Sequence, residues 1–400
     1  MFILPADRLE VKSMSRALCL LLCLSSFALA QTANTHSDGT ASSSAVQVVY
    51  TVDGSTLTTY NVDSQTLQAA EVGTITLSES TYPYLITSPN GHFLYYEAVK
   101  DYSDAGRNLY VYDTDASGLP GTTPVQKINA QWLYAMAAHP NGQFLYTVAQ
   151  GSSSTGLVPY AIVRYLIDQS SGKLSQNVTE ATYHLESGTS FCSPGILGFN
   201  TDGTTMYDAV FCSYPHGTSA ATYYARSVDL QTGALGPDRQ IYTWNYYAGS
   251  GGENVQFRNN LMFDFGVTQF GGDWVNVYRV QQKLSTPLVN CTSSMWTVCG
   301  NLGWALAHPS GQYVFVFDST NITDIGQVNL STQQITQTSS IPYEVQQFSP
   351  DGTIAYGVND VNGALDIEIY GFSVALGQVT QGGTISVPSD LDSWFAAERY

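Results

Sequence analysis

The chain has few charged residues, and few of those are positive. Charged residues make up 12% of its 400 positions, about half of what an average globular protein carries. Lysine and arginine total 14 against 32 aspartate and glutamate, which gives a net charge of −18 at pH 7. A chain this acidic repels the phosphates of nucleic acids and of anionic membranes. We therefore expect no nucleic-acid partner and a surface built from Ser, Thr, Asn, Gln and Tyr.

Long apolar runs are missing beyond the N-terminus. Residues 17–24 are apolar, follow two basic residues, and precede Ala28-Leu29-Ala30, which matches a signal-peptidase site. No later segment approaches the roughly 18 apolar residues that a membrane span needs. The sequence predicts a signal peptide over 1–30, a flexible segment over 31–45, and an exported monomer without a membrane span.

Cysteines are few, and none has the spacing of a zinc site. Outside the predicted signal peptide the chain has Cys192, Cys212, Cys291 and Cys299. No pair is spaced as CxxC and no histidine clusters with them, so disulfides are favoured over zinc in an exported protein. Four cysteines allow three pairings, and proximity favours Cys192 with Cys212 and Cys291 with Cys299. We expect no metal and no cofactor.

One short pattern recurs along the chain. "SPNGHFLYYEA" at 88–98 is closely matched by "HPNGQFLYTVA" at 139–149, "HPSGQYVFVFD" at 308–318 and "SPDGTIAYGVN" at 349–359. Proline presets φ, Asn or Asp tolerates the left-handed region, and glycine supplies a positive φ, so each copy predicts a tight turn that leads into a strand. The expected turn glycines are Gly91, Gly142, Gly203, Gly311 and Gly352.

Two further units complete the series. In "VQFRNNLMFDFGV" the pair Asn259-Asn260 takes the place of the glycine turn. Residues 46–68 have the later strands of a unit but no first strand, and residues 392–400 supply a first strand with nothing after it. Helical periodicity is nearly absent. Strand-rich units repeating every 40 to 60 residues are typical of β-propellers, so we predict an all-β, seven-bladed propeller over 46–400. Its blades would be four-stranded and antiparallel, and its N- and C-terminal strands would share one blade.

The repeated corners resemble those of the seven-bladed YVTN-repeat and lactonase-like (6-phosphogluconolactonase-like) superfamily. The residues that carry the resemblance are Pro89-Asn90-Gly91, Pro140-Asn141-Gly142, Asp202-Gly203, Pro309-Ser310-Gly311 and Pro350-Asp351-Gly352, each with the aromatic strand that follows it. The resemblance covers essentially the whole predicted mature chain and implies the propeller fold. Enzymatic members open lactones with His, Arg and acidic residues at the mouth of the central channel, but no catalytic motif transfers to this chain residue by residue.

Residues that recur at one repeat position are expected to serve the scaffold. His139 and His308 both precede the turn glycine by three residues, so we expect each to hydrogen-bond the local backbone. At the entries of the first strands the units differ, and there aromatic and amide side chains could hold a small polar ligand. These candidates are Tyr82, Tyr84, Trp132, Asn254, Trp304 and Trp394. Packing between blades is the alternative explanation for the aromatic ones.

Three arginines fall on predicted third strands: Arg164, Arg226 and Arg279. They could form an anion site, but pairing with surface acids is the favoured interpretation, because third strands lie away from the axis. We expect a secreted propeller that binds a small polar ligand, a glycan or an extracellular protein at the channel mouth. The alternative is a metal-independent lactone hydrolase that uses Glu253 or Glu344 with an arginine such as Arg279. A structural surface protein is the second alternative.

Overall fold

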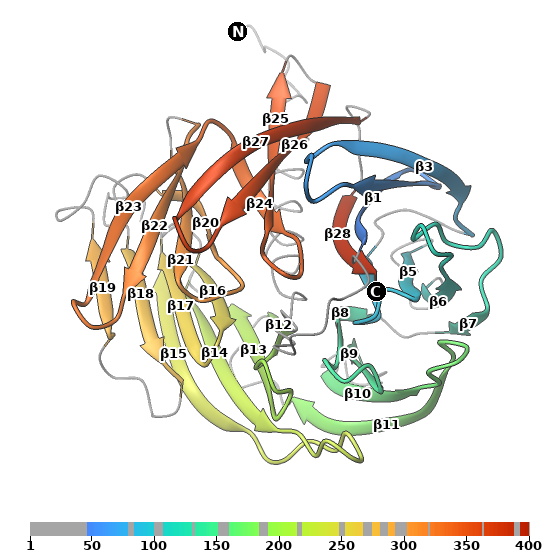
Figure 1. Cartoon of the computed structure of the whole chain (residues 1–400). Coiled ribbons are helices and arrows are strands. Elements are labelled where there is room, and N and C mark those ends of the chain that lie inside the picture. The colour runs from blue at the N-terminus through green and yellow to red at the C-terminus, as the bar shows by residue number, and fades with distance from the viewer. Residues whose placement is uncertain are drawn as a thin grey trace, which may run out of the picture.

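The fold is seen in a computed structural model of the chain. It describes residues 46–78, 84–99, 107–129, 133–150, 160–183, 191–213, 218–247, 253–266, 274–280, 287–292, 302–318, 321–361, 364–387 and 393–399. These residues form seven four-stranded antiparallel sheets set radially around an axis (Figure 1). None of the described segments is a helix that could cross a membrane. The predicted signal peptide and the segment over 31–45 lie outside the described residues.

The seven sheets are blades 1 to 7, and within each blade the strands follow one another from the innermost to the outermost. Blade 1 consists of β28 (Ser393–Arg399), β1 (Val46–Asp53), β2 (Thr56–Val62) and β3 (Ala69–Thr76). Blade 2 consists of β4 (Tyr84–Thr87), β5 (Phe93–Val99), β6 (Arg107–Asp113) and β7 (Gln126–Asn129). Blade 3 consists of β8 (Leu133–Ala138), β9 (Phe144–Gln150), β10 (Tyr160–Ile167) and β11 (Leu174–Tyr183).

The remaining blades follow in chain order. Blade 4 consists of β12 (Phe191–Phe199), β13 (Thr205–Ser213), β14 (Thr218–Ser227) and β15 (Arg239–Tyr247). Blade 5 consists of β16 (Glu253–Arg258), β17 (Leu261–Gly266), β18 (Trp274–Arg279) and β19 (Val289–Thr292). Blade 6 consists of β20 (Leu302–Ala307), β21 (Tyr313–Asp318), β22 (Thr323–Asn329) and β23 (Gln334–Ile341). Blade 7 consists of β24 (Glu344–Phe348), β25 (Ile354–Val361), β26 (Ala364–Ser373) and β27 (Gln378–Val387).

The two ends of the chain close the ring, as the split repeat predicts. β28 pairs antiparallel with β1, from Val46 opposite Arg399 to Val52 opposite Ser393. The innermost strands of neighbouring blades also contact one another all around the axis. Closure of this kind covers the inner edge of β1, which would otherwise be open to another strand.

The repeated turns adopt the predicted backbone. Gly91, Gly142, Gly203, Gly311 and Gly352 have φ values of 70°, 74°, 73°, 68° and 75°. In blade 5, Asn259 and Asn260 take φ values of 47° and 61°, so two asparagines make the left-handed turn that a glycine makes elsewhere. The prediction of a degenerate unit there is confirmed.

In several blades a tyrosine on the second strand locks the blade to the next one. Tyr146 is fully buried on β9 of blade 3, and its hydroxyl donates a 2.5 Å hydrogen bond to the carbonyl of Gly233 in blade 4. Tyr50 makes the same bond to Gly118 of blade 2 at 2.7 Å. Each bond contributes about 1 kcal/mol net, in addition to the burial of the ring. The recurring tyrosines therefore fix the distance between blades.

The repeated histidines also act between blades. Nδ1 of His139 accepts the backbone N–H of Asn141, and Nδ1 of His308 accepts that of Ser310, which confirms the predicted local bonds. The other nitrogen reaches further, because Nε2 of His139 bonds the carbonyl of Gly203 in blade 4 at 2.9 Å. Nε2 of His308 bonds the carbonyl of Gly352 in blade 7 at 2.8 Å. We call these two contacts the histidine bridges.

Candidate functional site

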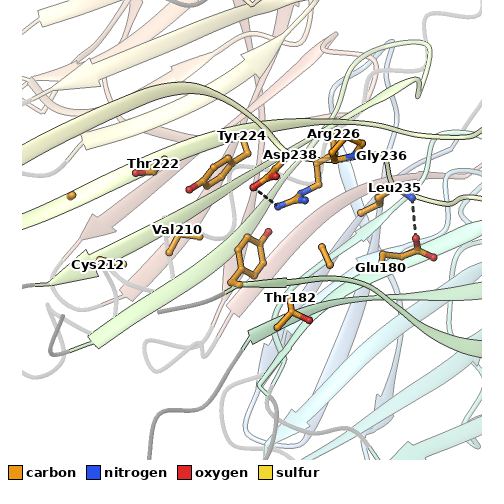
Figure 2. A pocket seen from close by; sticks show the side chains of 14 residues that line it. Glu180, Thr182, Val210, Cys212, Thr222, Tyr224, Arg226, Leu235, Gly236 and Asp238 are labelled. Atoms are coloured by element: carbon orange, nitrogen blue, oxygen red, sulfur yellow. Dashed lines mark hydrogen bonds and ion pairs between the residues drawn. The ribbon is translucent and has the colours of Figure 1, made fainter. Parts of the chain in front are cut away.

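A cleft opens between the outer strands of blades 3 and 4. Figure 2 shows the side chains that line it. The volume of the cleft is about 480 Å³, within the range of small-molecule sites. One wall comes from the end of β11 and the other from β13, β14 and the connection into β15. The residues that line it are Glu180, Ala181, Thr182, Tyr183, Val210, Cys212, Ala220, Thr222, Tyr224, Arg226, Leu235, Gly236, Pro237 and Asp238. We call this space the blade 3–4 cleft.

A buried carboxylate lies behind the cleft. Asp208, in the middle of β13, has no exposed surface. Its Oδ1 accepts a hydrogen bond from Nε of Arg226 at 3.1 Å, and its Oδ2 accepts one from the hydroxyl of Tyr183 across the blade boundary. Burial raises the pKa of the Asp208 carboxyl, and the guanidinium of Arg226 opposes that rise. Burial and the neighbouring Asp208 together raise the pKa of Tyr183, so its phenol stays protonated and donates.

The guanidinium of Arg226 is held on several sides. Its central carbon lies 5.5 Å from the ring centre of Tyr183 and 5.9 Å from that of Tyr224, close enough for cation–π attraction. Nη2 lies 3.8 Å from Oδ2 of Asp238, whose side chain is 56% exposed, whereas that of Arg226 is 7% exposed. Burial acts to lower the pKa of Arg226, but the charges of Asp208, Tyr183 and Asp238 and the hydrogen bond to Asp208 together outweigh it, so the pKa is raised. Arg226 therefore stays charged inside the protein.

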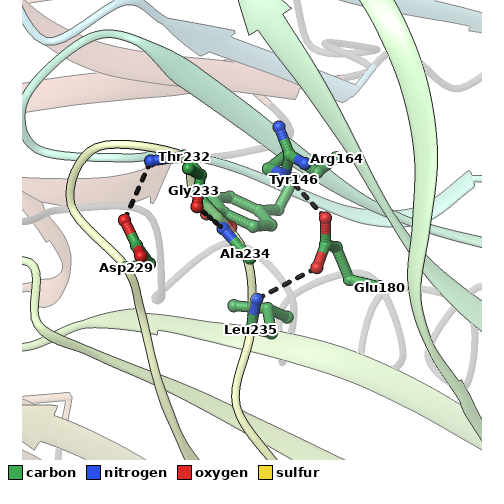
Figure 3. Close-up of polar contacts among 8 residues, drawn as sticks. All are labelled: Tyr146, Arg164, Glu180, Asp229, Thr232, Gly233, Ala234 and Leu235. Atoms are coloured by element: carbon green, nitrogen blue, oxygen red, sulfur yellow. Dashed lines mark hydrogen bonds and ion pairs between the residues drawn. The ribbon is translucent and has the colours of Figure 1, made fainter.

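A second ion pair builds one wall of the cleft (Figure 3). Oε1 of Glu180 lies 2.7 Å from Nε of Arg164 on the adjacent strand β10, and both side chains are largely buried. Oε2 of Glu180 accepts the backbone N–H of Leu235 in blade 4 at 3.0 Å. Both carboxylate oxygens are thus engaged, and the pair bridges the two blades beside the bond between Tyr146 and Gly233.

A disulfide lies at the far end of the cleft. Cys192 on β12 and Cys212 on β13 are directly opposite each other, with their Cα atoms 4.1 Å apart, and they are joined. The predicted pairing of these two cysteines is confirmed. Cys291 is also disulfide-bonded, and Cys299 lies outside the described residues. The disulfide between Cys192 and Cys212 ties β12 to the strand that carries Asp208.

The chemistry of the cleft suits binding better than catalysis. Among its described lining residues are two threonine hydroxyls, two acids and no histidine. Glu180 in the wall and Asp208 behind it already accept hydrogen bonds on both oxygens, so neither is placed to take a proton from a substrate. The hydroxyls, the tyrosine rings and the arginine can hydrogen-bond and pack against a polar molecule.

The sequence-predicted residues at the channel entrance are only partly described. Tyr84 begins β4, and its hydroxyl donates to the carbonyl of Met136 in blade 3 at 3.3 Å. Trp394 on β28 is 7% exposed and packs edge-on against Tyr356, 6.1 Å between ring centres. Glu344 begins β24, and burial raises the pKa of its carboxyl. The amide of Gln346 lies 3.4 Å from the Glu344 carboxylate.

For the other predicted entrance residues the structure describes the backbone alone, or the residue lies outside the described ranges. Glu253 and Asn254 begin β16 and Trp304 lies on β20, but only their backbones are described. Tyr82 and Trp132 lie outside the described residues. The structure therefore brings Tyr84, Trp394 and Glu344 to innermost strands, with Trp394 packed between blades.

The three arginines lie on the third strands, as expected, but their surroundings differ from the prediction. Arg164 and Arg226 are 9% and 6% exposed, so they pair with acids inside the protein and not on its surface. The outermost strand and turn of the neighbouring blade cover them. Arg279 is exposed at the end of β18, opposite Leu261 beside the Asn259-Asn260 turn. Glu253 begins the same blade at its other end, so Arg279 and Glu253 do not meet.

Of the residues that make the cleft, sequence reasoning singled out Arg226 and Cys212 and missed Asp208, Tyr183, Glu180 and Asp238. Asp208 lies in an otherwise apolar strand, at the position where other blades have Tyr96, Thr147, Val316 and Gly357. Blade 5 has the same feature, since Asp264 is 1% exposed and its Oδ2 accepts hydrogen bonds from Trp274 and Asn276. A lone aspartate after Met-Tyr or Met-Phe was the available signal. No sequence pattern distinguished Tyr183, Glu180 and Asp238 from other polar residues.

Comparison with known proteins defines the fold. No protein-family model and no curated protein matches the chain. Among solved structures it resembles a "putative 6-phosphogluconolactonase" from Bacteroides uniformis, at 13% identity and a TM-score of 0.56 over 88% of this chain and 99% of the other. It is equally similar to the periplasmic gluconolactonase PpgL of Pseudomonas aeruginosa, at 13% and 0.56 over 88% and 98%. A protein from Lactobacillus plantarum matches at 13% and 0.54 over 88% and 99%. Identities this low establish architecture alone: the chain has the fold of the lactonase-like seven-bladed propellers.

Proposed function

We propose that the protein is an exported propeller that binds a small polar ligand in the blade 3–4 cleft without transforming it. The observation that carries this is a 480 Å³ space lined by the buried Arg226, two tyrosines and two threonines. Export is supported by the signal-peptide pattern over 1–30 and by the disulfide between Cys192 and Cys212. The channel mouth around Tyr84 and Glu344, where the sequence predicts the ligand to bind, is the alternative location.

A thermal-shift screen of the purified mature protein tests the proposal. The compounds are sugars, polyols, small carboxylic acids and amino acids, and a ligand raises the midpoint of unfolding because it binds the folded state alone. Each hit is repeated on Thr182→Trp, which places a ring in the cleft from an exposed position of β11. Thr179→Trp is the matched control, since Thr179 is exposed on the same strand but does not line the cleft.

The outcomes separate the alternatives. Shifts abolished by Thr182→Trp and kept by Thr179→Trp support binding in the cleft. Shifts in the unfolding midpoint that persist in both variants would indicate that the ligand binds at the axial entrance or on another face. A flat result across small molecules, glycans and candidate extracellular proteins favours a structural surface protein.

Lactone hydrolysis is the second candidate function. It is supported by the position of Glu344 at the start of an innermost strand, where burial raises the pKa of its carboxyl toward that of a general acid or base. Two proteins of the same fold bear gluconolactonase names. Turnover in a lactone panel that is lost in Glu344→Gln or Glu253→Gln would replace the binding proposal. Absence of turnover for every lactone would remove hydrolysis as a candidate function.

A further inference from the structure

The guanidinium of Arg226 has a fixed inner edge and an unused outer edge. Nε donates to Asp208 at 3.1 Å, and the central carbon lies over the rings of Tyr183 and Tyr224, 5.5 Å and 5.9 Å from their centres. Nη2 approaches Asp238 only to 3.8 Å, which is too long for a hydrogen bond. Within the described part of the chain, neither Nη atom donates a hydrogen bond to a carboxylate. The side chain is nevertheless only 7% exposed and lines the cleft.

An arginine has several N–H donors, and Asp208 takes the one on Nε, so donors of Arg226 remain for an acceptor in the open space of the cleft. We propose that the ligand of the blade 3–4 cleft carries a carboxylate that pairs with the two Nη atoms of Arg226. The two Nη groups and a carboxylate can lie in one plane and form two parallel hydrogen bonds. This inference rests on the proposed function and specifies its ligand as a small organic acid.

The local charges are arranged to accept that carboxylate. Asp208 balances Arg226 from behind, and Glu180 is bound on both oxygens by Arg164 and Leu235. Asp238 is the remaining nearby acid, and its side chain is 56% exposed, so it can turn into solvent when a ligand arrives. The net charge of −18 is spread over the whole chain, and charges beyond about 8 Å are largely screened at physiological ionic strength. Asp238 therefore acts as an internal competitor for the outer edge of Arg226.

Ligand-observed NMR titration with L-lactate and its neutral counterpart L-lactamide tests the inference. Lactate should bind the wild type and should not bind Thr182→Trp. Lactamide, which lacks the charged carboxylate, should bind the wild type at least about tenfold more weakly than lactate does. In Asp238→Asn the competitor loses its charge, and lactate should bind about threefold to fivefold tighter. Glu71→Gln removes one negative charge from an exposed site in blade 1 and should leave binding unchanged.

Arg226→Lys completes the test without leaving Asp208 unpaired. Lysine keeps the positive charge beside Asp208, so the fold is retained, but it lacks the planar edge. Lactate binding should fall by about tenfold. Equal binding of lactate and lactamide, or unchanged lactate affinity in Asp238→Asn, would overturn the carboxylate inference. If neutral polyols still bind and are blocked by Thr182→Trp, the proposed function stands while this inference fails; if nothing binds in the cleft, both fail.

Discussion

The interface between blades 3 and 4 resembles that between blades 6 and 7 near the repeated turns. The two interfaces differ further from the turns. Each has a histidine bridge at its turn end, from His139 to Gly203 and from His308 to Gly352. Around His308 the space is filled by aromatic rings, with Phe372 and Phe348 centred 4.8 Å and 5.0 Å away.

Beyond His139 the interface between blades 3 and 4 opens into the cleft. Its outer part is built on buried charges, those of Asp208, Arg226, Glu180 and Arg164. Both interfaces have an apolar cluster near the histidine, with Phe144 and Phe199 between blades 3 and 4 and Phe315, Phe348 and Phe372 between blades 6 and 7. Between blades 3 and 4 the buried ion pairs lie beside that cluster. The turn end therefore sets the spacing of blades, and the residues further out decide whether the boundary is packed or leaves room for a ligand.

The largest expected effect comes from breaking the charge pair of the cleft. Arg226→Met leaves Asp208 buried without its cation, and we expect a loss of about 3–5 kcal/mol in the free energy of unfolding at neutral pH. The double variant Asp208→Asn with Arg226→Met should recover most of the loss, as measured by urea unfolding. A single variant as stable as the wild type would show that the pair does not stabilise the fold.

The pH dependence of that variant gives a further check. Without Arg226, burial raises the folded-state pKa of Asp208 above its unfolded value. Such a group contributes stability that is present at low pH and lost as the pH rises through the folded pKa. The deficit of Arg226→Met relative to the wild type should therefore shrink as the solution is made mildly acidic. A deficit that is constant with pH would mean that Asp208 does not titrate.

The histidine bridges should differ in strength. His308→Ala removes a ring packed among Tyr313, Phe315, Phe348 and Phe372 together with its bond to blade 7, and we expect a loss of about 3 kcal/mol. His139→Ala should cost less, about 2 kcal/mol, because its described ring contacts are those with Phe144 and Phe199. Urea unfolding of both variants measures the difference. A larger loss for His139 would reverse the comparison.

Acid should act on the packed interface through His308. Burial lowers the pKa of His308 to about 4, against about 6.5 in an unfolded chain. A group with a depressed folded pKa contributes stability above its unfolded pKa and loses it as the pH falls toward the folded one. The contribution is about 3 kcal/mol at most, lost between about pH 6.5 and 4. His308→Gln keeps a donor for Gly352 but does not titrate, so its unfolding midpoint should change less over that window. Parallel pH profiles would contradict this.

The fold could be predicted from local pattern, whereas the cleft could not. The turns at Gly91 and Gly142 and the asparagine turn at Asn259-Asn260 are recognisable within a few residues, because a left-handed backbone restricts which residues fit. Ring closure followed from a first strand missing at one end of the chain and present at the other.

The cleft depends on how one blade packs on the next. Tyr183 and Arg226 lie 25 and 18 residues from Asp208 in sequence and meet it only across packed strands. The same reason explains why Arg164 and Arg226 were expected on the surface. A third strand is far from the axis, yet the outer strand and turn of a neighbouring blade cover it, and no pattern within one repeat reveals that cover.

The smallest expected effect on stability is that of Asp238→Asn. Its carboxylate is 56% exposed and lies 3.8 Å from Nη2 of Arg226, and exposed pairs of this kind contribute between about 0 and 1 kcal/mol. We expect a change below about 0.5 kcal/mol by urea unfolding, far less than for Arg226→Met. A loss above about 1 kcal/mol would make Asp238 an anchor of the guanidinium and not a competitor for it. If Asp238→Asn leaves the free energy of unfolding almost unchanged and lactate binds more tightly, the outer edge of Arg226 is available to a ligand. Among its described residues, the packed interface between blades 6 and 7 has no counterpart to that edge.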